Sequence, residues 1–492
     1  MAFSSVKFLF LFLPLFLVIY YAIPYRLKNV TILIFSLVMV FSFDNLSAIV
    51  LFFSLGMNYS FGRLIHNKGR FWAIALGISM NVALLSVFKY HHLLTELIFS
   101  LVGICPGPAT TMHMLSSFVL PVGISFYTFR LISYLVDIHR KKTEPEYNFI
   151  DFAVCFAFFP LLLAGPIARY IDLKNELRTR RLSFIQIALG IERFIIGLGL
   201  KVLIANALGT VADQVFSMPA DHLSTPMAWL GLVSYTMQIF FDFAGYTGMA
   251  IGLGMMTGFT FPENFNYPYI SKNIREFWRR WHMTLSSWLR DYVFLPVAYY
   301  YSKKWKKETY FRMDTNDILY TIATLVTFVI CGFWHGSSLT FLLWGLYYGF
   351  FMIMEQVFLK RALHRLWIPL QHLYAMVVIM GGWVLFRSSN MDQAVHFYDK
   401  LIVFSKGSGA VNSYISFFTV NRETFITLVC AIILSTPLMS IINKRIIARS
   451  TASHWIGPAY SLLRLGFLFF LLLISLTFVA AQTYNPFIYF RF

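Results

Sequence analysis

One histidine of this chain lies inside a long apolar stretch. His335 belongs to the segment Cys-Gly-Phe-Trp-His-Gly at 331–336, and apolar runs flank the segment on both sides. A titratable side chain at membrane depth is costly unless it is paired or used, so this position indicates a functional site. A neutral, buried imidazole keeps a low pKa and can take a proton from a hydroxyl group. We interpret His335 as a general base; a buried histidine bonded to a nearby carbonyl is the alternative. The flanking glycines would let another backbone or a substrate come close.

A second histidine, His282, lies in a polar and aromatic segment at 275–293. If this segment is one helix, its polar residues fall within a sector of roughly 80°. The members of this stripe are Arg275, Arg279, His282, Ser286 and Arg290. Aromatic residues, Trp278 among them, fall on the other side. The pattern fits an interfacial helix with tryptophan anchors. It also fits the wall of a cavity for a phosphate-bearing or thioester donor, in which His282 supports the chemistry.

Gln238 and Asp242 lie in the apolar run 226–256. A carboxylate inside a membrane needs a partner, so we expect a structural salt bridge from Asp242 to Arg275 or Arg279. We expect a structural role, or a place in the wall of the cavity, for Asp242, Gln238, Asn264 and Trp334. The four cysteines have no Cys-x-x-Cys spacing, so neither a zinc site nor a disulfide framework is predicted, and we expect no metal.

The composition shows which kind of elements must position these residues. The chain has 492 residues, of which 58% are hydrophobic and 13% charged, whereas soluble domains carry roughly 25% charged residues. This predicts an all-α polytopic membrane protein. The net charge of +18 could suggest a nucleic-acid partner, but the basic residues lie in short loops between apolar runs. That distribution is typical of a membrane protein whose loops follow the positive-inside rule. We therefore predict that the protein lies in a lipid bilayer and has no nucleic-acid partner.

Several apolar runs are shorter than the ~20 residues of a full membrane span. The runs lie at 8–24, 29–43, 46–61, 71–90, 113–137, 150–165, 184–217 (as two helices), 226–256, 318–333, 338–358, 367–386, 423–442 and 461–482. Broken helices at membrane depth are tolerated where protein or a water-filled cavity covers the freed backbone groups. We therefore expect roughly 11 transmembrane helices plus re-entrant and interfacial helices around a central funnel or cavity.

Charge in the loops predicts the orientation of the chain. We expect the cytoplasmic loops to be those with basic clusters at 26–28, 63–70, 140–142, 178–181, 303–307, 360–365 and 444–449. The segments 43–46 and 218–226 lack Lys and Arg and are expected outside. The run 8–24 is then an uncleaved first membrane helix, and both termini lie outside. We find no internal repeat, which weakens the alternative of a transporter or lipid flippase.

Several motifs resemble one known family. The segment 274–282, continued by Ser286, Trp288 and Arg290-Asp291-Tyr292, resembles the signature of the membrane-bound O-acyltransferases, and 331–336 resembles their catalytic-histidine segment. The segments 121–129, 164–170 and 262–266 resemble the bacterial branch of that family. This branch includes membrane subunits of alginate and peptidoglycan O-acetyltransferases and the teichoic-acid D-alanyl transfer protein.

The resemblance implies a ring of tilted helices around a thinned centre. A cytosolic funnel would admit an acyl thioester, most readily acetyl-coenzyme A or else an acyl-carrier-protein thioester, with no permanently bound cofactor. His335 and His282 would be catalytic at its end. The residues expected to bind the donor are Arg275, Arg279, Arg290, Trp278 and Ser286. The acyl group would leave on the outside, to an SGNH-type esterase or acyltransferase partner that modifies a polysaccharide.

The aromatic tail, with Tyr489 in Phe-Ile-Tyr-Phe-Arg-Phe at 487–492, resembles the C-terminal motif of a small teichoic-acid D-alanylation subunit. The resemblance implies that Tyr489 could accept the acyl group, activated by His335; an interfacial anchor is the alternative. In two places the chain departs from the alginate-type pattern, at Thr247-Gly248 and in the lysine-rich loop after the signature. These departures leave the acyl group and the acceptor open.

We predict a single domain over 1–492, with N-terminal helices at 1–137, a catalytic core at 138–386 and C-terminal helices with the tail at 387–492. The core contains the signature helix 274–292 and the His335 segment. The expected function is O-acylation of a cell-surface polysaccharide by an enzyme of the bacterial cytoplasmic membrane. D-alanyl transfer to teichoic acid, a transporter, and a scaffold that only recruits an esterase are the alternatives.

Overall fold

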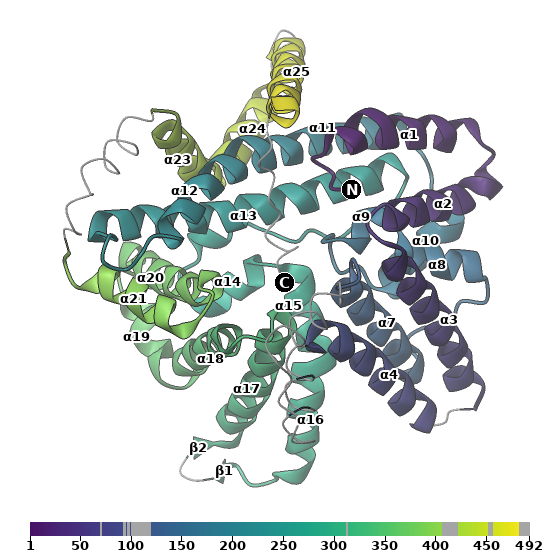
Figure 1. Ribbon diagram of the computed structural model, residues 1–492. Coiled ribbons are helices and arrows are strands. Elements are labelled where there is room, and N and C mark those ends of the chain that lie inside the picture. The colour runs from purple at the N-terminus through teal and green to yellow at the C-terminus, as the bar shows by residue number, and fades with distance from the viewer. Residues whose placement is uncertain are drawn as a thin grey trace. The chain divides into compact units, whose positions relative to one another are not determined.

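The computed structural model describes residues 1–68, 71–91, 95, 99, 120–310, 313–405, 422–450 and 456–481. In these ranges the chain is helical apart from loops and one antiparallel hairpin, in which β1 (Thr309–Tyr310) pairs with β2 (Met313–Asp314) (Figure 1). The predicted all-α membrane class is confirmed. Two compact units are present, Met1–Ile191 with Ala250–Pro262, and Glu192–Met249 with Glu263–Phe492. Each is described by itself below.

The first unit contains the N-terminal helices. They are α1 (Leu13–Ala22), α2 (Lys28–Phe41), α3 (Asn45–Lys68), α4 (Phe71–Lys89), α7 (Ile124–His139), α8 (Phe149–Ala157), α9 (Phe159–Leu162) and α10 (Tyr170–Thr179). A π-helical turn (Phe8–Phe12) precedes α1, and a 3-10 turn (Tyr25–Leu27) precedes α2. The boundary between the units falls within α11 (Phe184–Gly199) and α13 (Thr225–Met256).

The second unit contains the proposed chemistry. Its helices, besides parts of α11 and α13, are α12 (Asn206–Phe216), α14 (Ile274–Arg280), α15 (Met283–Leu289), α16 (Leu295–Lys304), α17 (Thr315–His335), α18 (Leu339–Met354), α19 (Lys360–Arg365), α20 (Ile368–Arg387), α21 (Met391–Ile402), α23 (Arg422–Leu434), α24 (Leu438–Ser450) and α25 (Ile456–Ala481). Short π-helical segments lie at Leu200–Ala205, Arg290–Phe294 and Glu355–Leu359, and a 3-10 turn at Pro268–Ile270. α17 packs along α18, and α18 packs on α20 (Figure 1).

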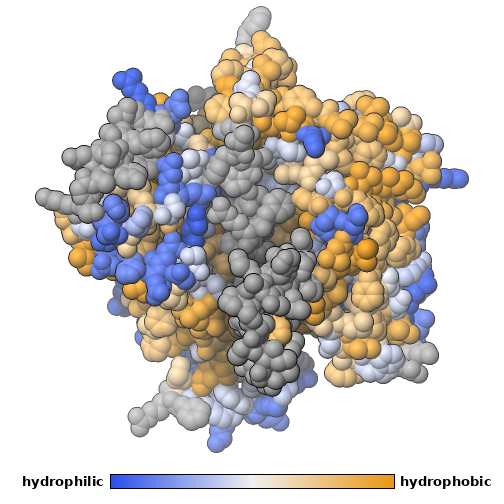
Figure 2. Space-filling view, viewed as in Figure 1, coloured by the Kyte–Doolittle hydropathy of each residue, from blue (hydrophilic) through white to orange (hydrophobic). Residues whose placement is uncertain are grey.

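Eight helices in the described ranges are long and apolar enough to cross a membrane. The count becomes nine if α23 and α24, which are bent by 62° at their junction, form one broken span. The chain is therefore a multi-pass membrane protein, while the expected total of roughly 11 spans is not confirmed. Hydrophobic side chains cover the visible faces of α1, α2 and α25, as expected for surfaces in contact with lipid (Figure 2).

The prediction of two helices in the run 184–217 is wrong. α11 and α12 form one continuous helix over Phe184–Phe216, joined through the π-helical segment Leu200–Ala205. A π-bulge absorbs one extra residue without ending the helix, and no proline or glycine pair follows it to force a break. The sequence pattern alone does not reveal such a bulge.

The expectation of broken helices is confirmed at α8 and α9, which are only 9 and 4 residues long. Gly123, just before α7, has a φ of +75°, and a Cβ there would lie 2.3 Å from the carbonyl oxygen of Leu162. Only glycine combines this left-handed backbone with so close an approach. It fixes the entry of α7 against the loop after α9.

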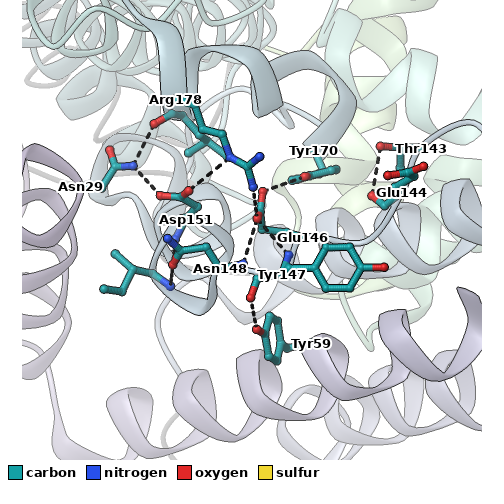
Figure 3. A network of polar contacts seen from close by, with 12 residues as sticks. Asn29, Tyr59, Thr143, Glu144, Glu146, Tyr147, Asn148, Asp151, Tyr170 and Arg178 are labelled. Atoms are coloured by element: carbon teal, nitrogen blue, oxygen red, sulfur yellow. Dashed lines mark hydrogen bonds and ion pairs between the residues drawn. The ribbon is translucent and has the colours of Figure 1, made fainter. Parts of the chain in front are cut away.

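A buried carboxylate organises the polar edge of the first unit (Figure 3). Glu146 accepts hydrogen bonds from Arg178 at 2.5 Å, from the hydroxyl of Tyr170 at 3.0 Å, and from the backbone N–H groups of Tyr147 and Asn148 at 2.9 Å. With four donors the charge is well satisfied despite its burial. The network ties the loop after α7 to α10.

Candidate active site

The signature segment is not one helix. α14 ends at Arg280 and α15 begins at Met283, and between them His282 has a left-handed backbone with a φ of +43°. The prediction of a continuous helix over 275–293 is therefore wrong. The backbone turns there because it is bonded to a neighbouring loop, as described below, and tertiary contacts of this kind leave no periodicity in the sequence.

Four of the five polar residues predicted on one stripe nevertheless share a cavity of about 320 Å³. The cavity is lined by Arg275, Trp278, Arg279, Ser286, Leu289, Arg290, Phe294, Tyr320, Thr324, Thr327, Phe328, Cys331 and Met352. His282 is absent from this lining. Trp278, predicted on the aromatic side, also lines the cavity. All five predicted donor-binding residues therefore lie around one space.

The face of α17 leads along this cavity toward His335. Tyr320, Thr324 and Cys331 line the cavity at helical spacing, and His335 is the next residue on the same face, one turn beyond Cys331. Only 4% of His335 is exposed. The imidazole therefore lies one turn past the part of α17 that lines the cavity.

Aromatic rings surround His335. Its ring centroid lies 4.7 Å from that of Trp334, 4.8 Å from Trp344 and 5.1 Å from Phe386, while Phe341 stacks at 6.5 Å. Together with its low exposure, these rings keep bulk water away from the imidazole. An imidazole shielded in this way can take a proton from a hydroxyl group that is brought to it.

The expectation that the glycines beside His335 allow another backbone to come close is confirmed for Gly332, while Gly336 lies against a side-chain ring. A Cβ on Gly332 would lie 2.6 Å from the carbonyl oxygen of Phe341, and one on Gly336 would lie 2.3 Å from its ring. Across the contact, a Cβ on Gly345 would lie 2.3 Å from the carbonyl oxygen of Phe328. α17 and α18 therefore meet through a glycine seam.

Trp334 lies next to both histidines. The His282 ring centroid is 6.3 Å from the Trp334 ring, which is itself 4.7 Å from His335. His282 is 1% exposed and packs edge-on against Phe243 at 4.7 Å. The two histidines, 53 positions apart in the sequence, thus lie around one tryptophan.

Asn264 contacts His282 from the loop after α13. Its Oδ1 lies 3.0 Å from His282 Nδ1, and it accepts hydrogen bonds from the Thr284 backbone N–H at 3.3 Å and the Thr284 hydroxyl at 2.8 Å. Its backbone carbonyl accepts from the N–H of Met283 at 2.9 Å. Burial lowers the pKa of His282 to about 3, so this imidazole is neutral at physiological pH.

The start of α14, with Arg275, is positioned by Glu355, just after α18. Its carboxylate accepts the N–H groups of Ile274 at 2.7 Å and Arg275 at 3.1 Å, which satisfies the first turn of α14. Arg275 also donates to Gln356, and its guanidinium lies 5.3 Å from the centre of the Tyr320 ring. Arg275 therefore has a fixed place in the wall.

A second cavity, of about 490 Å³, shares Arg275 and Arg279 with the first. Its walls are mainly polar and comprise Lys272, Asn273, Arg275, Glu276, Arg279, Glu355, Lys360, Leu363, His364, Ile368 and Gln371. Arg279 has no hydrogen-bond or ion-pair partner among the described residues. An apolar chamber and a cationic polar chamber thus adjoin at two arginines.

The predicted partner of Asp242 is wrong. Asp242 pairs with Lys201 at 2.5 Å, with each side chain 2% exposed, and Lys201 also donates to Asn206 at 2.8 Å. Lys201 comes from the π-helical segment after α11, and the salt bridge therefore joins that segment to α13. Gln238 is buried one turn before Asp242.

Lys201 and Glu355 were not predicted as site residues from the sequence. Both are single charges in apolar runs, and the cost of such charges at membrane depth could have drawn attention to them. Tyr489 lies outside the described residues.

Comparison with known proteins adds a separate line of support. A sequence model of the membrane-bound O-acyltransferase family matches residues 145–369, which include both histidines. The chain is 38% identical to a probable alginate O-acetylase of Azotobacter vinelandii over 82% of its own length and 78% of that protein. It is 30% identical to a peptidoglycan O-acetyltransferase of Helicobacter pylori over 100% of its length and 97% of that protein. It is 35% identical to a teichoic acid D-alanyltransferase of Bacillus subtilis over 54% of its length and 65% of that protein.

Proposed function

Since the chain belongs to the membrane-bound O-acyltransferase family, and is an acyltransferase, we propose that it transfers an acetyl group from a cytosolic thioester for O-acetylation of a bacterial cell-surface polysaccharide. The observation that carries the proposal is the cavity lined by three arginines, whose α17 wall continues to His335. The names of the relatives support acetyl transfer to a polysaccharide.

The two adjoining cavities support a thioester donor such as acetyl-coenzyme A. The phosphates of the donor would face the basic residues of the polar cavity, which are Arg275, Arg279, Lys272, Lys360 and His364. The apolar chamber would hold the thioester arm. The neighbouring lysines at 303–307 would attract an anionic donor to the same side, which loop charge predicts to be cytosolic.

The apolar chamber favours acetyl over D-alanyl. A D-alanyl group carries an ammonium, which would need an acidic partner in an apolar site. The lining of this chamber includes three arginines and neither Asp nor Glu among the described residues. An uncharged acetyl group avoids this conflict, and D-alanyl transfer is therefore the second candidate.

In the proposed reaction His335 takes the proton from an acceptor hydroxyl. The hydroxyl oxygen attacks the thioester carbonyl carbon, the C–S bond breaks, and the thiolate leaves and recovers the proton from the imidazolium. The products are an O-acetyl ester and a free thiol, so no other reactant is needed. The acceptor would be the Tyr489 hydroxyl or a group of an extracytoplasmic partner of SGNH type, which would carry the acetyl group to the polymer.

The test incubates the purified full-length protein with labelled acetyl-coenzyme A and follows label by mass spectrometry. Wild type, His335→Ala and Tyr489→Phe are compared. Label on Tyr489 in wild type, lost in both variants, would support a relay through the tail. Transfer to a partner without label on Tyr489 would support direct transfer by His335. Donor binding without any transfer in wild type, or transfer unchanged in His335→Ala, would contradict the proposal.

A further inference from the structure

The bonds around Asn264 determine which nitrogen of His282 carries the proton. The side-chain atom of Asn264 that faces Thr284 accepts a backbone N–H, which an amide NH₂ group cannot do. That atom is therefore the oxygen. Since His282 Nδ1 lies 3.0 Å from the same oxygen, Nδ1 must be the donor in that contact.

The protonation state then follows for the whole ring. Burial keeps His282 neutral, and a neutral imidazole carries a single N–H. With the proton on Nδ1, the lone pair is on Nε2. In this form His282 can accept a hydrogen bond or a proton at Nε2, and it cannot donate a hydrogen bond there.

The same asparagine also holds the backbone. His282 adopts a left-handed conformation that non-glycine residues rarely take, and such residues persist where their surroundings enforce them. Asn264 supplies bonds to the two following residues, Met283 and Thr284. The side chain that sets the tautomer therefore also stabilises the turn that presents the ring.

We propose that Asn264 is a positioning residue that keeps His282 in the Nδ1–H tautomer, so that His282 acts in acyl transfer as an acceptor at Nε2 and not as a donor to the developing oxyanion. The kinetic part rests on the function proposed above, and the tautomer itself does not.

The first test is ¹⁵N NMR of the full-length protein labelled at histidine, with His282→Gln used to identify the His282 signals. We expect the Nδ1–H form in wild type at neutral pH. Asn264→Asp should retain it, because a carboxylate oxygen also accepts from Nδ1. Asn264→Ala should lose it. An Nε2–H form in wild type, or an unchanged tautomer in Asn264→Ala, would overturn the proposal whether or not acetyl transfer is detected.

The second test is kinetic. Asn264→Ala should lower kcat by about tenfold or more while the KM for the donor changes by less than about threefold, since general acid–base assistance contributes at least that much. Asn264→Asp should restore most of kcat and shift the acid limb of the pH profile upward, because its charge favours the imidazolium. The matched control, Thr284→Val, removes a bond to the same oxygen but leaves the histidine contact, and should keep kcat within about twofold of wild type.

A purely structural role would give a different pattern. Asn264→Ala and Thr284→Val would then lower thermal stability and activity together, and Asn264→Asp would leave the pH profile unchanged. That result would overturn the positioning role. If wild type transfers no acyl group from any thioester while the Nδ1–H signal is present, the proposed function fails and the tautomer assignment stands.

Discussion

At the scale of single residues, the chemistry of His335 follows from what surrounds it. Its neighbours are aromatic rings. The arginines predicted from the sequence line a cavity, and the α17 wall of this cavity reaches Cys331, one helical turn before His335. The sequence could predict both features, since apolar runs flank the histidine and the arginines recur at helical spacing. It could not predict that Asp242 pairs with Lys201, because that choice depends on how α13 meets the segment after α11.

The pair of Lys201 and Asp242 leads to a prediction about stability. Asp242→Asn leaves a lysine buried without its counter-charge, which typically costs about 3–5 kcal/mol. We expect a clear drop in the thermal unfolding midpoint in detergent. The double variant Lys201→Met with Asp242→Leu should recover most of the lost thermal unfolding midpoint, because two apolar side chains replace the buried ion pair. An equally stable Asp242→Asn protein would contradict this, and the exposed Asp221→Asn is the control.

His282 predicts a pH dependence of stability. Its folded pKa of about 3 lies below the ordinary value of 6.5, so its contribution is complete above pH 6.5 and is lost as the pH falls toward 3. At pH 5 the loss amounts to about 2 kcal/mol. Thermal unfolding between pH 7.5 and 5 should therefore be less pH-dependent for His282→Gln than for wild type. The exposed His396→Gln should keep the wild-type dependence, and equal slopes in all three proteins would refute the assignment.

At the scale of elements, the important feature is the break between α14 and α15. Hydrophobic periodicity placed Arg275, Arg279, Ser286 and Arg290 correctly, since all four line one cavity. It was wrong about the faces of two residues, because Trp278 lines the cavity as well and His282 does not. It missed the turn at His282, which depends on bonds from a loop 18 residues earlier. Turns stabilised by distant side chains leave no local pattern, whereas caps such as Asn273 at the start of α14 do.

Glu355 allows the placement of α14 to be tested separately from charge. Glu355→Ala removes both acceptors from the first turn, and we expect the KM for the donor to rise about tenfold, as for the loss of a strong helix cap. Glu355→Gln keeps an acceptor oxygen and removes a negative charge beside a cationic cavity, so its KM should stay near wild type or fall. Steady-state kinetics on both variants measures the two KM values. A KM raised equally in both would show that the charge of Glu355 matters more than its hydrogen bonds to the first turn of α14.

At the scale of the whole molecule, the composition was enough to predict a multi-pass helical protein. The number of spans was harder, because length and hydropathy do not distinguish a bent pair such as α23 and α24 from two separate spans. Interfacial and re-entrant helices depend on which side of a helix faces protein, and that is decided by packing among distant parts of the chain.

Loop charge predicts an orientation that can be measured directly. In a protein without its native cysteines, Asp221→Cys should react with a membrane-impermeant maleimide in intact cells. Lys304→Cys, at the end of α16, should react only after permeabilisation. Both side chains are exposed, so burial does not interfere. The reverse labelling pattern would invert the proposed topology and place the cationic cavity on the outer side.

The glycine seam between α17 and α18 has a mechanical consequence. With backbone against backbone at Gly332 and Gly345, α17 has no soft layer of side chains on which to roll or slide. His335 is then held rigidly in place. The rate of the reaction would be set by the binding of the substrates and the release of the products.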